Sequence, residues 1–449
     1  MDVLKVNTPT CTCTISSFPE FALLCHLNVP IKRGTVAVQS LLSIMARDVP
    51  VELWRRIFNF AVGAGLETEF DSFVEIGRWE RNYYQLTNYT QTMTTKLALV
   101  LVCKRWNAIA SALLYQYLRP TSIPKLKVLT QSFSEGGDWH DRGRWVVRLD
   151  IPIEEGTVGG SKRIEDILAI LPLVRNLRIL IIHGWILTRD GHDAIVRELV
   201  NLPSVELLHV YHWDGIGDGS YSAPYLNLAH LRTFSGGWGF RTPRQHGLTP
   251  ALTVTVHGQH LTTLLLKLGY TADFPLANMD FPSLTALGLS GNNSAEELGE
   301  IDGLLRFLDR HGPRLTSLGF DQLTPASSML QVEKELLNRC TCLTEVVYFS
   351  MLRREYHLPQ VQRPSVRSVG FYLSHLQDRV RLRFMNQVGM DLEDPYGLLQ
   401  FPGIQAVRIV DLAFGSMSPA VQAAFVTAPR RFVLEDGEGM KVPPSQLLV

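Results

Sequence analysis

One spacing of apolar residues recurs between residues 146 and 409. The pattern apolar-x-x-apolar-x-apolar appears nine times, and a tenth, degenerate copy begins at Leu231 and keeps Phe234. Because neighbouring side chains of a strand point to opposite faces, each copy predicts a short strand with its apolar residues on one face. The copies recur about every 29 residues, which indicates a repeat architecture. They begin at Val146, Leu177, Val205, Leu231, Leu261, Leu284, Leu315, Leu343, Val366 and Ile404.

Helical signals separate several of these copies. Ile195, Leu199 and Leu202 are spaced for one face of a helix, and Ser418-Pro419 is typical of a helix start. Strands and helices in alternation predict an α/β solenoid with parallel strands inside and helices outside. An ordinary α/β domain with a doubly wound sheet is the alternative, but it would not keep ten copies of one strand signature.

One copy resembles the leucine-rich repeat in more than its spacing. Leu284-x-x-Leu287-x-Leu289 is followed by Asn292, where that family places an asparagine that hydrogen-bonds the turn. Most other copies lack this asparagine, so the resemblance implies irregular repeats. We assign the repeats to residues 120–435 and interpret residues 436–449 as a C-terminal tail.

The residues that alternate with the apolar positions should form the concave face of such a solenoid. Aromatic and charged side chains among them suit a protein-binding surface. The predicted substrate-binding residues are His183, His209, Tyr211, Lys267, Asp321, Phe349, Tyr372 and Arg408.

The segment 46–119 has a helical pattern with surplus apolar surface. Leu53, Ile57 and Phe60 form one stripe, and Trp54 and Phe58 form a second about 100° further round the helix. A small domain cannot cover both stripes, so one of them needs a partner. The alternative is a self-contained three-helix subdomain packed on the rest of the chain. Residues 1–45 lack sustained periodicity and are interpreted as a flexible tail.

This segment resembles an F-box, the helical module that docks onto the adaptor of cullin-type ubiquitin ligases. The matching residues are Pro50-x-Glu52-Leu53, Ile57-Phe58, Val102-Cys103, Trp106 and Leu114-Tyr115. Residues 63–95 depart from the family as a long inserted loop, which costs little entropy but could crowd the docking face. Cys103 follows an apolar run and is expected to be a small core residue. The residues expected to contact the adaptor or to form the core of the module are Pro50, Leu53, Trp54, Ile57, Phe58, Val102, Cys103 and Trp106.

The two resemblances together imply a function. The helical module would bind a Skp-type adaptor, and through it a cullin, while the repeats recruit a protein substrate for ubiquitination. Such a chain would be a receptor subunit with no catalysis of its own. A protein-interaction scaffold with a non-functional F-box is the alternative, and an enzyme built on an α/β core is a third reading with the weakest support.

Composition and missing motifs argue against several other classes of function. The 43 basic and 43 acidic residues leave no net charge to attract nucleic acid. The six cysteines lack the spacing of a zinc site, so we expect no metal and no cofactor, and their sparseness suits a reducing compartment, the cytosol or nucleus. The common nucleotide-binding, serine-hydrolase and zinc-protease motifs are missing, and no apolar window is long enough to span a membrane.

Overall fold

A computed structural model gives the fold of the chain. It describes residues 49–62, 82–135, 141–152, 160–183, 189–211, 228–238, 258–268, 279–291, 301–320, 334–348, 363, 365–371, 401–410, 417–427, 432–436 and 441–442. The chain divides into two compact units, residues 1–53 and residues 54–449. In the first unit the described residues are 49–53, which end in the first turn of helix α3 (Val51–Val62).

The second unit is built on a sheet whose strands follow one another in chain order. The first twelve are parallel, and the thirteenth pairs antiparallel with the twelfth. The strands are β1 (Tyr117–Leu118), β2 (Arg148–Pro152), β3 (Ile179–His183), β4 (Leu207–Tyr211), β5 (Thr233–Trp238), β6 (Thr263–Leu268), β7 (Ala286–Gly291), β8 (Ser317–Phe320), β9 (Glu345–Tyr348), β10 (Ser368–Phe371), β11 (Ala406–Ile409), β12 (Val433–Glu435) and β13 (Lys441–Val442). Parallel neighbours in unbroken chain order are the arrangement of a solenoid, and a doubly wound sheet would reverse that order.

All ten predicted strands are confirmed as β2 to β11. Their apolar positions are in register across the sheet, as in the pairs Leu180–Leu208 and Leu264–Leu287. One prediction needs correction at the C-terminus. Lys441 and Val442, expected in a tail, pair with β12 and close the end of the sheet.

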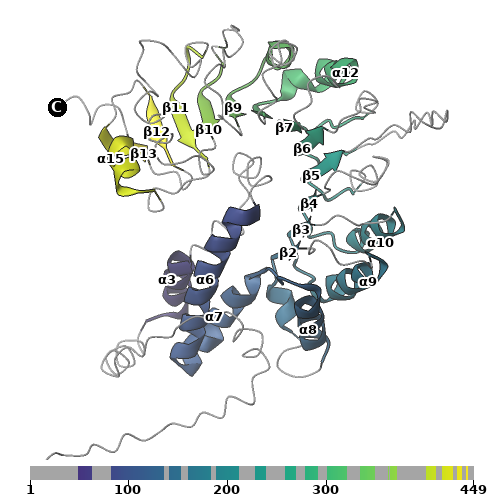
Figure 1. The fold of residues 1–449 in the computed structure, drawn as a ribbon, viewed down its shortest axis with the longest axis vertical. Coiled ribbons are helices and arrows are strands. Elements are labelled where there is room, and N and C mark those ends of the chain that lie inside the picture. Colours follow the sequence, from purple (N-terminus) through teal and green to yellow (C-terminus); the bar gives the residue numbers. More distant parts are fainter. Residues whose placement is uncertain are drawn as a thin grey trace, which may run out of the picture. The chain divides into compact units, whose positions relative to one another are not determined.

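Helices pack on one face of the sheet and complete the core. Figure 1 draws α8 (Ile123–Ser134), α9 (Gly160–Ile170), α10 (Arg189–Val200) and α12 (Ile301–His311) on the same side of the strand row. One continuous core joins strand residues such as Leu208 to helix residues such as Leu199 and Leu308, all fully buried. The predicted helix start at Ser418-Pro419 is confirmed by α15 (Pro419–Thr427). We call the opposite face of the sheet the inner face.

A repeated hydrogen-bond pattern fixes the spacing of the repeats. The carbonyl oxygen before one strand accepts from two successive backbone amides of the next repeat, as Arg178 does from Glu206 (2.9 Å) and Leu207 (3.0 Å). In four consecutive repeats a threonine adds its hydroxyl to the preceding carbonyl, at 3.1 to 3.3 Å. These residues are Thr262, Thr285, Thr316 and Thr344.

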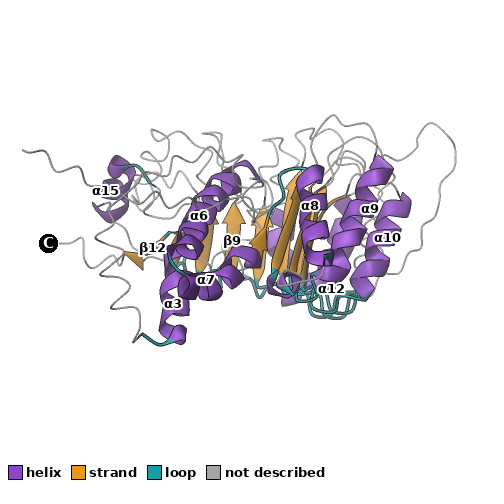
Figure 2. Ribbon diagram, turned by 90° about the horizontal axis from the view of Figure 1, so that it is seen from below, coloured by secondary structure: helices purple, strands orange, loops and turns teal. Residues whose placement is uncertain are grey.

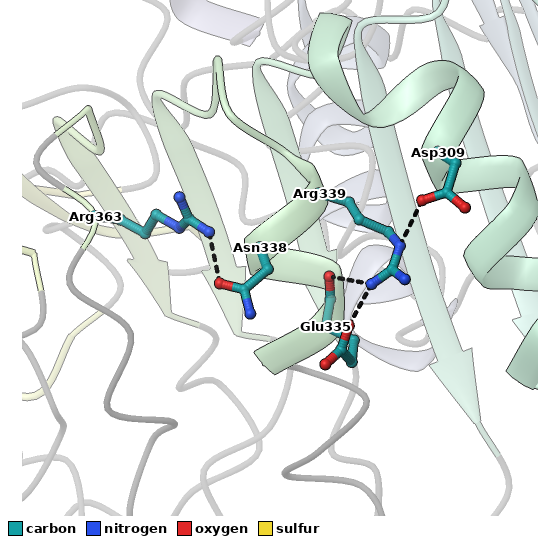
Figure 3. A network of polar contacts seen from close by, with 5 residues as sticks. All are labelled: Asp309, Glu335, Asn338, Arg339 and Arg363. Carbon is teal, nitrogen blue, oxygen red and sulfur yellow. Dashed lines mark hydrogen bonds and ion pairs between the residues drawn. The ribbon is translucent and has the colours of Figure 1, made fainter.

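Polar side chains tie successive repeats together beside the helices. In Figure 3, Arg339, within the helical residues 334–339, donates through Nε to Asp309 of α12 at 2.7 Å and also contacts Glu335. Arg363 of the following repeat donates to Asn338 at 2.9 Å. Three repeats are therefore linked by charge-assisted bonds as well as by their core.

The helices α3, α6 (Asn82–Val102) and α7 (Lys104–Gln116) precede the sheet and are drawn beside one another in Figure 2. Residues 82–95 are helical, whereas an inserted loop was expected from 63 to 95. This helix could not be predicted from apolar periodicity, because residues 82–95 are mostly polar and have no clear apolar face. α7 passes directly into β1, so the helices and the sheet form a continuous structure at this point.

Candidate functional site

The helical module has an aromatic core of its own. Trp54 and Phe58 on α3 lie with ring centroids 5.5 Å apart, and each is 4.8 Å from the ring of Trp106 on α7. Phe58 and Val62 are each 1% exposed, while Trp54 is half-buried. The four-residue spacing of Trp54, Phe58 and Val62 puts them on one face, and this face of α3 is the one that packs inward.

The neighbouring face of α3 is open. Ile57 is 49% exposed and Phe60 is 91% exposed, and the C-terminal end of α6 adds Leu101 at 53% and Val102 at 38%. We call these four residues the helical patch. Among the described residues of 54–449, the other exposed large apolar side chains are Val128 and Val200. Ile57 and Phe60 are three residues apart and neighbour each other on α3, and contiguous exposed apolar side chains mark sites of interaction more often than single ones do.

The predicted docking residues fall into two groups. Phe58 and Trp106 are buried and Trp54 is half-buried, so these three serve the core of the module. Ile57 and Val102 belong to the exposed helical patch. In the first unit, Pro50 is exposed and Leu53 is 48% exposed.

The expectation for Cys103 is wrong. Cys103 is exposed, and its extended backbone (φ −162°, ψ 167°) makes it the N-cap of α7. The apolar run that suggested burial ends with α6, and the chain turns at this residue to begin α7. A helix break cannot be recognised from apolar composition alone, and no proline or glycine marks it.

The inner face carries the predicted substrate-binding residues in two rows. The sheet register places His183 beside Tyr211, and Lys267 beside Gly237, in the row at the ends of the strands. His209 lies beside Ser235, and Arg408 lies between Gly370 and Glu435, in the row two residues earlier. By backbone register these positions alternate with the core positions of their strands, and their substrate-binding role stays a prediction. Asp321, Phe349 and Tyr372 lie outside the described residues.

Along β3 to β8, the described side chains in the row two residues before the strand ends are buried. Ile179, Ile181 and Leu207 form a second small apolar cluster, separate from the main core. His209 is only 6% exposed, so its ring is not freely available to a partner. Buried hydroxyl groups of Thr233, Ser235 and Ser317 also face this side.

At β1 and β2 the inner face holds a buried polar network. Tyr117 donates its hydroxyl to Asp150 Oδ2 at 2.6 Å, and Arg148 binds both carboxylate oxygens of Asp150 at 2.8 and 3.0 Å. The Arg148 guanidinium also lies 4.6 Å from the centre of the Tyr117 ring. Burial, and then the negative charge of Asp150, raise the pKa of Tyr117 well above its usual value, so this phenol stays protonated and keeps donating.

Helix α6 covers this network. The rings of Tyr89 on α6 and Tyr117 are 4.8 Å apart, and the Tyr89 hydroxyl accepts from the backbone amide of Arg119 at 3.3 Å. The helical module is therefore joined to the first repeats through a ring contact and a partly buried hydrogen bond as well as through the chain itself.

The described residues form no metal site. Within them, no three His, Cys, Asp or Glu side chains gather closely enough to hold a metal ion. Over the same residues, no helix has both the length and the apolar character needed to cross a membrane. The described cysteines, Cys103, Cys340 and Cys342, are free thiols.

Known proteins resemble this chain at the level of the solved structures alone. No protein-family profile and no curated protein matches the chain. Among solved structures, the chain is similar to the leucine-rich repeat-containing protein LegL7 from Legionella pneumophila, at 13% sequence identity and a TM-score of 0.39. The similarity covers 74% of this chain and 94% of that one.

Sequence reasoning missed part of the site. Neither Leu101 nor the network of Tyr117, Arg148 and Asp150 is predicted from the sequence. The alternation Arg148-x-Asp150 within a strand pattern is a usable signal, because it places two opposite charges on the same face of one strand. Tyr117 lies 33 residues from Asp150, and only the parallel pairing of β1 with β2 brings them together.

Proposed function

We propose that this chain is a receptor subunit of an SCF-type ubiquitin ligase. The helical module would bind a Skp-type adaptor and through it a cullin, and the solenoid would bind the protein substrate. The chain would have no catalytic role and would act in the cytosol or nucleus.

The observation that carries the proposal is the two-sided character of α3. One face is fixed by the aromatic core of Trp54, Phe58 and Trp106, whereas Ile57 and Phe60 on the next face are exposed to solvent. At about 25 cal/mol per Å² of buried apolar area, covering side chains of this size is a strong driving force for association. A helix held rigidly by its own module also loses little conformational freedom when a partner binds.

The solenoid supports the second half of the proposal. Its inner face aligns residues from many repeats in straight rows, which is the geometry that repeat proteins use to bind extended partners. Because His209 is buried, we propose that a substrate contacts the row at the strand ends, which contains His183, Tyr211 and Lys267.

Capture of a purified Skp-type adaptor by the full chain tests the proposal. Wild-type protein should bind it, and Ile57→Asp combined with Phe60→Asp should abolish capture because charge would enter the apolar contact. These positions are preferable to Trp54 and Phe58, whose replacement would damage the aromatic core instead. A wild-type chain that captures no adaptor would leave only a repeat scaffold without a ligase role.

A further inference from the structure

The loops that lead into the strands form one edge of the sheet. A row of backbone carbonyl oxygens runs along this edge, because each accepts from an amide at the start of the next repeat. Figure 2 draws a stack of these loops in teal beside α12. We call the residues of this row, with the described residues among the six that precede each of them, the entry edge. The row consists of Val147, Arg178, Glu206, Arg232, Thr262, Thr285, Thr316, Thr344, Arg367 and Gln405.

The entry edge is positively charged. It contains ten arginines, no lysine and three acidic residues, although the chain as a whole is electrically balanced. The acidic residues are Asp141, Glu206 and Asp280. Seven of the arginines are exposed, namely Arg144, Arg175, Arg178, Arg232, Arg310, Arg314 and Arg367, and the partly exposed ones are Arg142, Arg339 and Arg363. Because neighbouring strands are about 4.8 Å apart, the charges of successive repeats follow one another along the edge.

The two halves of the entry edge differ in how these charges are balanced. In the first repeats Arg144 forms an ion pair with Asp141, and Arg178 forms one with Glu206 at 2.7 Å. Over β8 to β10, four arginines instead donate to neutral oxygens of an adjacent repeat, at 2.7 to 3.2 Å. The donors and acceptors are Arg310 and the Met279 carbonyl, Arg314 and the Pro282 carbonyl, Arg363 and the Asn338 side chain, and Arg367 and the Gly403 carbonyl.

A neutral acceptor holds an arginine in place without cancelling its charge. The guanidinium group has five N–H donors, so a bond to one carbonyl oxygen leaves others for an incoming anion. Since the head of the side chain is already positioned by the neighbouring repeat, it loses less conformational freedom when that anion binds. The stretch of the entry edge over β8 to β10 is therefore preorganised for anionic groups.

Few carboxylates oppose the arginines of this stretch. Asp309 and Glu335 both bind Arg339, Asp309 at 2.7 Å (Figure 3). Asp280, which is partly exposed, is the acidic residue that the entry edge itself contributes here. Glu345 begins β9, at a position of the inner face. The five arginines of this stretch thus outnumber the three carboxylates on the same side of the repeats.

We infer that the entry edge over β8 to β10 binds an acidic segment of a partner protein. Guanidinium groups pair with carboxylates through two parallel bonds, and the use of arginine without lysine suits that recognition. Single-stranded nucleic acid fits less well, because it stacks its bases on exposed aromatic rings, and Phe281 in these loops is fully buried. Other residues form the helical patch, so the inference does not depend on adaptor docking.

Binding of a fluorescent decaglutamate peptide to the full chain, measured by anisotropy, tests this inference. Wild type should bind the peptide, and added salt should weaken the complex because it screens the charges. The triple variant Arg314→Gln, Arg363→Gln and Arg367→Gln should bind roughly tenfold more weakly at low salt. Glutamine removes the charge but keeps an N–H donor for the neutral oxygen, so the contact between repeats can persist.

A matched variant controls for net charge. Arg55→Gln, Arg56→Gln and Arg197→Gln remove the same three charges at exposed positions outside the entry edge and should bind decaglutamate as wild type does. Thermal melting of both triple variants reports whether each is folded. Equal affinity of the two variants for the peptide would overturn the inference.

Two measurements on wild type need no substitution. Decaglutamate carrying a photoreactive group should attach to peptides that contain residues 310–316 or 363–367, and attachment confined to other parts of the chain would contradict the inference. An oligothymidine of equal charge should bind more weakly than the peptide. Tighter binding of the oligonucleotide, or no binding of decaglutamate at low salt, would overturn the assignment to an acidic protein segment.

Discussion

The ring of Phe234 fills the space beside Gly236. In the neighbouring strands the positions paired with Gly236 hold Val210 and Leu266, both of which point into the core. A Cβ atom at position 236 would lie 2.7 Å from Cζ of Phe234 and 2.8 Å from its Cε1. The degenerate repeat thus keeps its core volume by placing a large residue two positions earlier and no side chain at Gly236.

Replacing Gly236 with alanine should therefore destabilise the solenoid. The Phe234 ring is fully buried and would have to shift, so overpacking should cost about 1–3 kcal/mol. Denaturant unfolding followed by circular dichroism measures the loss. Adding Phe234→Leu should recover part of it, since the smaller side chain removes the clash. If the two substitutions were simply additive, the proposed exchange of volume between these residues would be wrong.

The buried pair of Arg148 and Asp150 should be sensitive to loss of charge. Asp150→Asn removes the carboxylate that Arg148 holds with two bonds and should destabilise the fold by about 3–5 kcal/mol. Tyr117→Phe removes one donor and leaves the ion pair, so it should cost only about 1–2 kcal/mol. Thermal unfolding of both variants shows which substitution destabilises the fold more. A larger loss of stability for Tyr117→Phe than for Asp150→Asn would contradict the prediction.

His311 should make stability depend on pH. Its ring is buried against Phe307, its Nε2 lies 3.2 Å from the carbonyl oxygen of Met279, and its Nδ1 is 3.2 Å from a nitrogen of Arg314. Because Arg314 can only donate, Nδ1 accepts and Nε2 carries the proton. Burial, with the positive charges of Arg314 and Arg310, lowers the pKa of His311, although the Met279 carbonyl and Asp280 oppose this.

The sign of the pH effect follows from this lowered pKa. As pH falls below about 6.5, the unfolded chain binds a proton at this histidine before the folded one does, so the folded state loses stability. The melting temperature of wild type should fall more between about pH 7.5 and 5.5 than that of His311→Gln. Burial also lowers the pKa of His230, so the melting temperature of His311→Gln should still depend on pH to some extent. Parallel pH curves for the two proteins would count against the assignment.

The thiols should differ in reactivity. Burial raises the pKa of Cys340 to about 12, so it has almost no thiolate at neutral pH, whereas Cys103 and Cys342 are exposed. Alkylation of native protein, resolved by peptide mass spectrometry, should label Cys103 and Cys342 and spare Cys340. Labelling of Cys340 as fast as the other two would show that its repeat opens readily.

The sequence predicted the solenoid well because its signal is repeated and local. Each copy, such as Leu261-x-x-Leu264-x-Leu266, predicts the position of a strand, its buried face and its register against the next strand. Each strand is predicted independently of the others. Even the degenerate copy at Leu231 therefore forms a strand in register, with Phe234 paired with Leu208. The two stripes of α3 were also readable, because helical geometry alone separates them.

The sequence could not decide which residues the tertiary contacts would cover. Which stripe of α3 packs inward depends on Trp106, 48 residues beyond Phe58 in the chain. The burial of His209 depends on what lies over the inner face, and strand alternation gives only the side to which a residue points. Cys103 shows the same limit, since a break between two apolar helices carries no apolar signal of its own.

The affinity of the full chain for a purified Skp-type adaptor is the most direct test of the central claim, that the exposed face of α3 is a docking surface. Ile57→Asp with Phe60→Asp should weaken binding at least about a hundredfold, because a buried charge would face an apolar contact. Val128→Asp with Val200→Asp makes the same chemical change at exposed valines of α8 and α10 and should bind as wild type does. Equal affinity of both double variants and wild type would contradict the claim.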